Sequence, residues 1–346
     1  MLAPIALLYG LIISLRDFFY RVGVLKSVKF DMPIISVGNL SVGGAGKTPH
    51  IEYLIRLLKD YINLATLSRG YRRKTTGFML AKPGMTANEL GDEPLQFAKK
   101  FPDITVAVGE SRAFAIPRII GAQPDTQLIL LDDAFQHRAV TPGLNILLTE
   151  YERLFTRDYL LPAGRLREWR SAYQRADIIV VSKCPPQLTP EVRQAIVDEI
   201  APKPYQRLYF SYYAYQQPYY IFNPGYTASF ESDWEVLFIS AIANTDYLMS
   251  YLSEQVNTVH LLEYEDHHYF SEDDMKALLK TFNNIQNPKK IIVTTEKDAT
   301  RLELHRDFLT THRLPIFALP VEVRFHFDDG PRFEQDIRDF LLNFKI

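Results

Sequence analysis

The sequence has little cysteine and no excess of positive charge. A single cysteine, Cys184, stands among 346 residues, which excludes an intramolecular disulfide and a zinc site built from several cysteines. It is compatible with a reducing cytoplasm. Because 39 lysines and arginines face 41 aspartates and glutamates, the overall charge does not favour binding to nucleic acid, and we expect no such partner.

Long hydrophobic runs are also scarce. The uncharged run at the start, Leu2 to Leu15, would reach about 21 Å as a helix, less than the ~30 Å hydrocarbon core of a bilayer. No basic segment precedes it, so a secretory signal peptide fits poorly. Cations and aromatic residues follow it, as in helices that lie in a lipid interface: Arg16, Phe18, Phe19, Tyr20, Arg21, Lys26 and Lys29. We therefore predict that residues 1–30 form a membrane-interface helix; the alternative is a helix docked on the protein's own core.

The remaining chain has the composition of a globular protein, with 47% hydrophobic and 23% charged residues. Short apolar runs alternate with amphipathic segments, which is typical of βαβ units around a parallel sheet. The runs in the first half are 34–37, 64–67, 104–108, 128–131, 146–148 and 178–181. Two further strands are predicted at 236–239 and 291–293, and a final helix at 333–344.

A glycine-rich segment, GNLSVGGAGKT at 38–48, lies between a predicted strand and a predicted helix. Backbone N–H groups of such a loop cradle phosphates, and the helix N-terminus favours the anion. Lys47 would reach the β- and γ-phosphates, and the hydroxyl of Thr48 would ligate Mg²⁺. The motif departs from the usual pattern at Ser41, where a glycine is expected. The predicted phosphate-binding residues are Ser41, Val42, Gly43, Gly44, Ala45, Gly46, Lys47 and Thr48.

The helix after this loop is predicted from apolar residues at helical spacing, which are Ile51, Leu54, Ile55 and Leu58. Its charged residues Glu52, Arg56 and Lys59 are expected to face solvent. We predict an α/β fold with a P-loop nucleotide-binding domain (31–204) and a smaller α/β domain (231–312). Aromatic-rich connecting strands (205–230) would join them, and a return strand with a C-terminal helix (313–346) would close the chain.

The apolar run at 128–131 ends in Asp132 and Asp133. Ligands of open α/β sheets bind at the carboxyl ends of the strands. We therefore predict that Asp132 holds the Mg²⁺ shell and that Asp133 assists it; the alternative is a strand-end cap.

A phosphate loop implies binding of a nucleoside triphosphate but not a particular reaction. A kinase needs a residue that positions an acceptor hydroxyl, whereas a GTPase switch or an ATP-driven chaperone needs none. The guanine-reading motif Asn-Lys-x-Asp is not matched by SKCP at 182–185 and only partly by TTEKD at 294–298. A membrane-peripheral NTPase switch or chaperone is the alternative to a kinase. A non-enzymatic scaffold would leave the loop and the aspartates without a purpose.

Several segments together resemble the tetraacyldisaccharide 4′-kinase family, the membrane-bound lipid A kinases of Gram-negative bacteria. They occur in the family's order, over roughly residues 1–300. The segments are SVGNL (36–40), SRGY (68–71), GDEP (91–94), LDDAFQH (131–137), LPAGRLRE (161–168), DHH (266–268) and VTTEKD (293–298).

The resemblance implies transfer of the γ-phosphate of ATP, with Mg²⁺, to the 4′-hydroxyl of tetraacyldisaccharide 1-phosphate, which forms lipid IVA. Its lipid A disaccharide precursor lies in the inner membrane. We therefore expect a monotopic or peripheral protein on the cytoplasmic face, in contact with inner-membrane lipids. No obligatory protein partner is inferred.

The resemblance also implies roles for individual residues. Asp92 would be the catalytic base and His267 its partner, reached from the other domain, while Lys47 would complete the catalytic set. By themselves, His267 and His268 are more typical of a solvated acidic turn. Substrate contacts are implied for Glu93, Arg69, Tyr71, Arg167 and Glu168, although Arg69 also fits a solvated basic face. Two residues of the 293–298 segment, Glu296 and Lys297, are expected to contact adenine or ribose.

Overall fold

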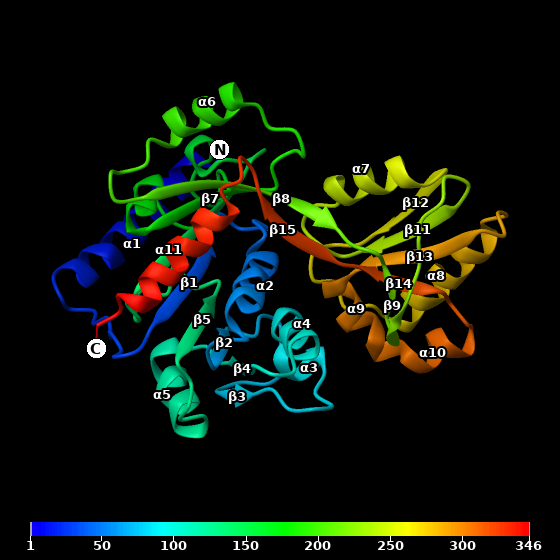
Figure 1. Ribbon diagram of the computed structural model, residues 1–346, viewed down its shortest axis with the longest axis horizontal. Helices are drawn as coiled ribbons and strands as arrows, with labels where there is room; N and C mark the ends of the chain where they lie inside the picture. The colour runs from blue at the N-terminus through cyan, green and yellow to red at the C-terminus, as the bar shows by residue number, and fades with distance from the viewer. Residues whose placement is uncertain (1, 346) are drawn as a thin grey trace.

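Two separate β-sheets organise the chain, which the computed structural model describes over residues 2–345. The first sheet contains β1 (Ile34–Asn39), β2 (Leu64–Ser68), β3 (Met79–Leu80), β4 (Thr105–Val108), β5 (Leu128–Asp132), β6 (Leu144–Glu150), β7 (Ile178–Ser182), β8 (Arg207–Tyr215) and β15 (Val321–Phe325). The second contains β9 (Tyr219–Tyr220), β10 (Asn223–Thr227), β11 (Glu235–Ser240), β12 (Thr258–Glu263), β13 (Lys290–Thr295) and β14 (Ile316–Leu319). Figure 1 shows the two sheets beside each other, each with its own helices.

The helices divide between the two sheets in the same way. Those of the first unit are α1 (Ala3–Arg21), α2 (Lys47–Leu58), α3 (Ala87–Leu90), α4 (Asp92–Lys100), α5 (Arg112–Ala122), α6 (Pro190–Ile200) and α11 (Gly330–Leu342). Those of the second are α7 (Asp246–Gln255), α8 (Glu272–Asn284), α9 (Glu296–Leu302) and α10 (Arg306–Thr311). Short 3₁₀ turns occur at Phe155–Arg157, Arg170–Arg175 and Glu303–His305.

The predicted α/β class is confirmed, with a mainly parallel first sheet and a smaller second one. Every predicted apolar run lies in a strand, to within one residue at the start of β4. The first sheet has the spatial order β15-β8-β7-β6-β1-β5-β2-β4-β3. Strand β1 pairs with β5 on one side and β6 on the other, and Val37 is in register with Asp132. The glycine-rich loop therefore leaves the sheet beside the two aspartates.

Two antiparallel strands connect the units. β8 pairs with β7 in the first sheet, and beyond that contact Tyr213 and Tyr215 pair with Val323 and Val321 of β15 (Figure 1). Sheet membership assigns residues 219–319 to the second unit, a wider range than the 231–312 that we predicted. The difference arises because β9 pairs antiparallel with β14 and β10 pairs antiparallel with β9, and such short aromatic segments carry little periodic signal.

The helix after the glycine-rich loop forms as predicted, with Ile51, Leu54, Ile55 and Leu58 in the core. The prediction for Glu52 is wrong, because only 1% of this residue is exposed. Helix α4 covers it: Gln96 Nε2 donates to Glu52 at 2.7 Å, and Lys100 Nζ lies 2.8 Å away. Sequence periodicity cannot reveal that a second helix covers the polar side of α2.

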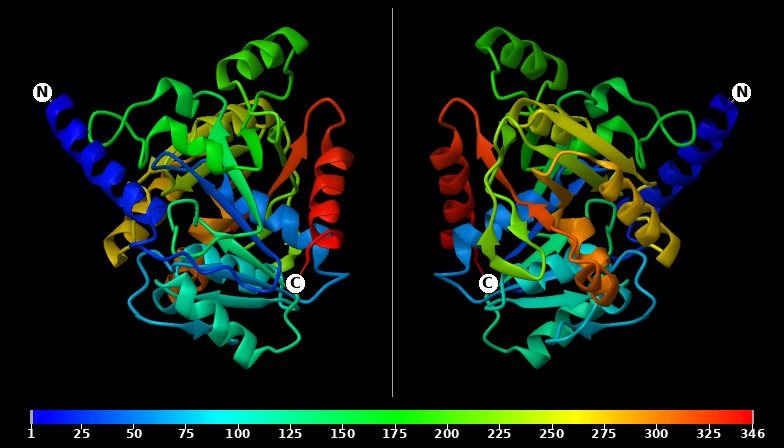
Figure 2. Two further views of the ribbon diagram at one scale, coloured as in Figure 1. Left: turned by 90° about the vertical axis from the view of Figure 1, so that its left-hand side faces the viewer. Right: turned by 90° about the vertical axis from the view of Figure 1, so that its right-hand side faces the viewer.

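Helix α1 rests on the first unit along one side only. Ala6, Gly10 and Ile13 are buried, and the indole N–H of Trp169 donates to the Ser14 hydroxyl at 2.9 Å. Figure 2 shows the helix at the edge of the molecule with its N-terminal end directed outward. Its exposed apolar side chains are Ile5, Leu7, Leu8, Leu11, Ile12, Leu15 and Phe18. Within residues 2–345, α1 is the one helix long and apolar enough to cross a membrane by length and composition.

Candidate active site

The glycine-rich loop turns from β1 into α2 at Gly46, which has a φ of +85°. A side chain there would also meet the hydroxyl of Tyr213, so the turn requires glycine for two reasons. Helix α2 then begins at Lys47, with its N-terminus directed into the loop. This is the strand, loop and helix arrangement that binds phosphates through backbone N–H groups.

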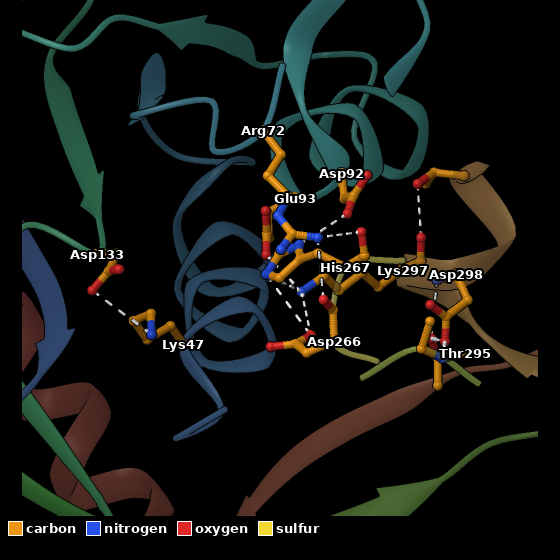
Figure 3. A network of polar contacts seen from close by, with 12 residues as sticks. Lys47, Arg72, Asp92, Glu93, Asp133, Asp266, His267, Thr295, Lys297 and Asp298 are labelled. Carbon is orange, nitrogen blue, oxygen red and sulfur yellow. Dashed lines mark hydrogen bonds and ion pairs between the residues drawn. The ribbon is translucent and has the colours of Figure 1, made fainter. Parts of the chain in front are cut away.

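Two cations converge on Asp133 beside this loop. Lys47 Nζ lies 3.7 Å from Asp133 Oδ1 (Figure 3), and Arg167 reaches the same oxygen at 2.9 Å. Lys47 also donates to Asn39 Oδ1 at 3.2 Å, and Arg167 donates to the Asn39 carbonyl at 3.0 Å. Burial opposes ionisation of Asp133, but Lys47 and Arg167 outweigh it and hold the pKa of this carboxyl well below its usual range.

Asp132 lies in a different environment. It is buried, and the Ser68 hydroxyl donates to its Oδ2 at 3.1 Å, while its Oδ1 has no hydrogen-bond partner among residues 2–345. Burial, followed by the nearby Glu93 and Asp133, raises the pKa of Asp132 to about 7. A buried carboxylate oxygen without a partner is a feature that a cation would satisfy.

The oxygen donors here fit Mg²⁺. In the described part of the chain, no group of three or more His, Cys, Asp or Glu side chains could hold a metal by itself. Mg²⁺ is commonly held by one or two carboxylates together with nucleotide phosphates, rather than by a complete protein cage. Asp132 and Asp133, beside the first turn of α2 that carries Thr48, match that requirement.

A second polar cluster lies where α4 of the first unit meets the second unit. Asp92, the first residue of α4, contacts Nδ1 of His267 at 3.2 Å and Nε of Arg301 at 3.5 Å, in each case through Oδ2. His267 follows β12 in a turn with a φ of +61°. Its N–H donates to the Ala241 carbonyl at 3.0 Å, and Arg72 donates to its carbonyl at 2.7 Å. Residues 175 positions apart thus meet across the two units (Figure 3).

Glu93 and Lys297 form the adjoining pair. Lys297 Nζ lies 3.0 Å from Glu93 Oε1 and 3.1 Å from His267 Nε2. Burial opposes ionisation of Glu93, but Lys297 and then His267 lower its pKa to about 2. We predicted that Lys297 contacts adenine or ribose; in the structure this lysine lies against Glu93 and His267.

Glu296 is the other residue for which we predicted a nucleoside contact. It is buried and bound to Lys100 Nζ at 2.6 Å, and the Tyr219 hydroxyl donates to it at 3.2 Å. Burial and the neighbouring Glu52 raise its pKa. Glu296 therefore joins the two units, and its carboxylate is already occupied.

The predicted substrate residues have different surroundings. Tyr71 is exposed and its ring meets that of His267 edge-on, with centroids 4.9 Å apart. Arg69 is exposed, and Arg167 lies at the phosphate loop. The prediction for Glu168 is not supported, because this residue is 0% exposed and binds Arg16 of α1 and, at 2.5 Å, Arg175. Docking of α1 buries Glu168, which the local sequence cannot reveal.

Sequence reasoning assigned no function to Asn39 or Arg301. Asn39 is the fourth residue of the SVGNL segment, and its place at the end of β1 was a usable signal. Arg301 follows Lys297 by four residues on α9, a spacing that places both residues on one face of a helix. Arg72 acts through long-range contacts to the turn at 266–267, for which the sequence carries no sign.

Comparisons with known proteins agree in pointing to one family. A model of the family described as tetraacyldisaccharide-1-P 4′-kinase matches residues 1–342. A tetraacyldisaccharide 4′-kinase of Bacteroides thetaiotaomicron is 42% identical, over 97% of this chain and 91% of its own length. One of Flavobacterium johnsoniae is 43% identical, over 94% of each chain. A crystal structure of LpxK from Aquifex aeolicus in complex with ATP is similar with a TM-score of 0.73, at 28% identity and 98% coverage of both chains.

Proposed function

We propose that this chain, which belongs to the tetraacyldisaccharide 4′-kinase family, transfers the γ-phosphate of ATP to the 4′-hydroxyl of tetraacyldisaccharide 1-phosphate. The product would be lipid IVA, in the biosynthesis of lipid A. The relatives are named as kinases, which supports a kinase as the class of enzyme for this chain. The steps below assign the chemistry to residues of this chain.

The nucleotide half of the site is the loop at 41–48. Its backbone N–H groups and the α2 N-terminus would hold the phosphate chain, and Lys47 would stabilise negative charge on the transferred group. Thr48, Asp132 and Asp133 would hold Mg²⁺, which neutralises charge on the β- and γ-phosphates when it is bound. Arg167, which shares Asp133 with Lys47, is placed to contact a phosphate as well.

The acceptor half of the site is Asp92. A carboxylate can hold the acceptor hydroxyl in line and take its proton as the new bond to phosphorus forms. His267 orients this carboxylate from the second unit, and Tyr71, exposed beside His267, is available for contact with the sugar. The observation that carries the proposal is the contact between Asp92 and His267, because it requires both units to form one site.

Helix α1 would deliver the enzyme to a lipid-borne substrate. Its exposed apolar side can enter a membrane interface, while its other side is held by Trp169. The segment that carries Trp169 also reaches the phosphate loop: the N–H of Val42 donates to the Arg165 carbonyl at 2.8 Å, and the N–H of Arg167 donates to the Leu40 carbonyl at 2.7 Å. We propose that the chain acts at the cytoplasmic face of the inner membrane, with its active site held close to that surface.

The test uses the purified full chain with γ-labelled ATP, Mg²⁺ and tetraacyldisaccharide 1-phosphate in detergent micelles. We expect the label in the lipid fraction. Replacing Asp92 by asparagine should lower kcat by about 10²- to 10⁴-fold with little change in ATP affinity. An Asp273→Asn variant, which alters an exposed carboxylate on α8, serves as the control. Release of labelled phosphate without a labelled lipid would contradict a kinase and favour the NTPase switch or chaperone.

A further inference from the structure

Two carbonyl groups at the end of the phosphate loop are held by buried side chains. The Ser182 hydroxyl, at the end of β7, donates to the Ala45 carbonyl at 2.8 Å, and His50 Nδ1 lies 2.7 Å from the Gly46 carbonyl. Ser182 and His50 are 0% and 3% exposed. Because the carbonyl and the N–H of a trans peptide point in opposite directions, these contacts direct the N–H groups of Gly46 and Lys47 to the other side. N–H groups at a helix N-terminus have no partner within the helix and can bind a phosphate.

His50 also contacts the strand that leads to the second unit. Its Nε2 lies 3.0 Å from the Ser211 hydroxyl on β8, and both residues are buried. Ser211 is the point at which β8 leaves the first sheet. The register between β7 and β8 ends at Phe210, and Ser211 pairs with Phe325 of β15. One imidazole therefore bridges the turn at Gly46 and the start of the connection between the two units.

Gly46 is a position that needs support from outside the loop. Its φ of +85° is one of several conformations that glycine adopts readily, so the residue does not fix its own conformation. The backbone N–H of His50 also donates to the Gly46 carbonyl, but at 3.3 Å, so the contact of Nδ1 at 2.7 Å is the shorter one. A Cβ on Gly46 would meet Nδ1 of His50 at 3.6 Å. The imidazole thus lies directly against the turn.

We propose that His50 is a positioning residue that fixes the phosphate loop for ATP and ties this loop to β8. A carbonyl oxygen can only accept a hydrogen bond, so Nδ1 of His50 carries a proton. The Ser211 hydroxyl can donate or accept, so Nε2 has a partner whether the ring is neutral or charged. The role therefore depends on the placement of the ring and not on its charge. It rests on the proposed function and adds a residue outside the segment 41–48.

The second contact of His50 gives the loop a fixed place relative to the connecting strand. An imidazole carries its two nitrogens on different sides of the ring, so it can bind Gly46 within its own helix and Ser211 on another element at once. Strand β8 leads from the first unit to the second unit, which carries His267. A phosphate chain held by the loop would thus keep its position relative to the strand that joins both halves of the site.

ATP affinity can be measured without turnover, by titration calorimetry of the full-length chain in detergent micelles with Mg²⁺ and without lipid substrate. In His50→Ala we expect the Kd for ATP to rise about three- to tenfold, because a hydrogen bond that orders the loop is lost. The amide of His50→Asn can take the place of Nδ1 and reach Gly46, so its Kd should stay within about twofold of the wild type. The amide of His50→Gln instead takes the place of Nε2, so this variant should resemble His50→Ala.

A double-variant cycle tests whether Ser211 acts through His50. Ser211→Ala should weaken ATP binding less than His50→Ala does, and the double variant should bind ATP no more weakly than His50→Ala alone. His326→Ala is the matched control, because His326 is a buried histidine whose ring packs against Tyr212 of β8, with centroids 4.6 Å apart. It should leave the Kd for ATP unchanged. Additive losses in the cycle, or an equal loss in the His326 variant, would overturn the proposal.

Kinetics with the lipid acceptor separate positioning from a loss of folded protein. In His50→Ala we expect the KM for ATP to rise with the Kd, while the KM for tetraacyldisaccharide 1-phosphate stays the same. A merely structural role would lower the active fraction of the chain and change neither KM. An unchanged Kd for ATP in folded His50→Ala would contradict the proposal, as would equal affinities in His50→Asn and His50→Gln, whether or not His50→Ala folds. Binding of ATP needs no lipid product, so a failure here is distinct from a failure of the proposed kinase activity.

Discussion

The ammonium of Lys47 and the carboxylate of Asp133 lie 3.7 Å apart, and the guanidinium of Arg167 binds that same carboxylate at 2.9 Å. Asp133 therefore forms ion pairs with two cations that a phosphate chain would also attract. Nucleotide binding would redistribute these contacts, with a divalent cation meeting the aspartates and the phosphates meeting Lys47 and Arg167. In the absence of a ligand, the carboxylate of Asp133 thus offsets positive charge of Lys47 and Arg167 beside the loop.

Replacing Lys47 by alanine should lower kcat by about 10²- to 10³-fold, because a charge aimed at the transferred phosphoryl group is lost. The fold should persist, since Lys47 is not part of the hydrophobic core. Turnover of labelled ATP and circular dichroism test both statements. The exposed Lys276 on α8 provides the control as Lys276→Ala, which should retain full activity. Full activity in the Lys47 variant would remove this residue from the catalytic set.

Binding of Mg²⁺ should weaken as the pH falls from 8 to 6. Burial raises the pKa of Asp132 to about 7, so below that pH its carboxyl is protonated in the metal-free chain and must lose the proton before it binds a cation. Titration calorimetry at pH 6 in two buffers should detect release of a proton that is largely absent at pH 8. Asp132→Asn should abolish that difference. A metal affinity independent of pH in the wild type would argue against Asp132 as a ligand.

Charges placed on the exposed side of α1 should detach the chain from lipid. Leu8 and Leu11 are 60% and 65% exposed, and each apolar side chain that enters a bilayer contributes about 1.5–3 kcal/mol. The double variant Leu8→Asp, Leu11→Asp should therefore reduce co-sedimentation with anionic vesicles at least tenfold. Leu342→Asp, at a still more exposed apolar position near the other end of the chain, should have no effect. Equal losses in both variants would contradict a specific role for α1.

The stability of the fold should depend on Lys100, because this lysine neutralises two buried carboxylates, Glu52 on α2 and Glu296 on α9. Lys100 lies 2.8 Å from Glu52 and 2.6 Å from Glu296, so Lys100→Met would leave two buried carboxylates without their cation. We expect a loss of about 3 kcal/mol in the free energy of unfolding. The pKa of Glu296 is already raised by burial and by Glu52. Without Lys100 the pair should take up a proton more readily, so the loss should be smaller at pH 5 than at pH 8.

Urea unfolding at the two pH values measures that difference. The more exposed pair of Lys99, on α4, and Glu303, just beyond α9, also joins the two units, and Lys99→Met should cost less than about 1 kcal/mol. Similar losses in the two lysine variants would show that burial of Glu52 and Glu296 does not decide the effect.

Local sequence patterns predicted much of the fold and the nucleotide half of the site. Runs of Ile, Val and Leu gave the strands because buried parallel strands are apolar on both faces. The loop around Lys47 and the two aspartates at the end of β5 could be predicted, because their chemistry needs residues that are neighbours in sequence or lie at the ends of adjacent strands. For Asp92 and His267, which lie 175 residues apart, the sequence offered a family resemblance and no local signal.

By itself, the sequence determined the elements, the phosphate loop and the apolar character of α1, since each depends on residues within one or two turns of chain. Only the tertiary structure decided which polar groups are buried and what they touch. It covered Glu52 with α4, enclosed Glu168 beneath α1, and set Lys297 against His267. Burial and charge pairing arise where surfaces meet on folding. The periodicity of residues along one helix does not indicate which other helix will cover it.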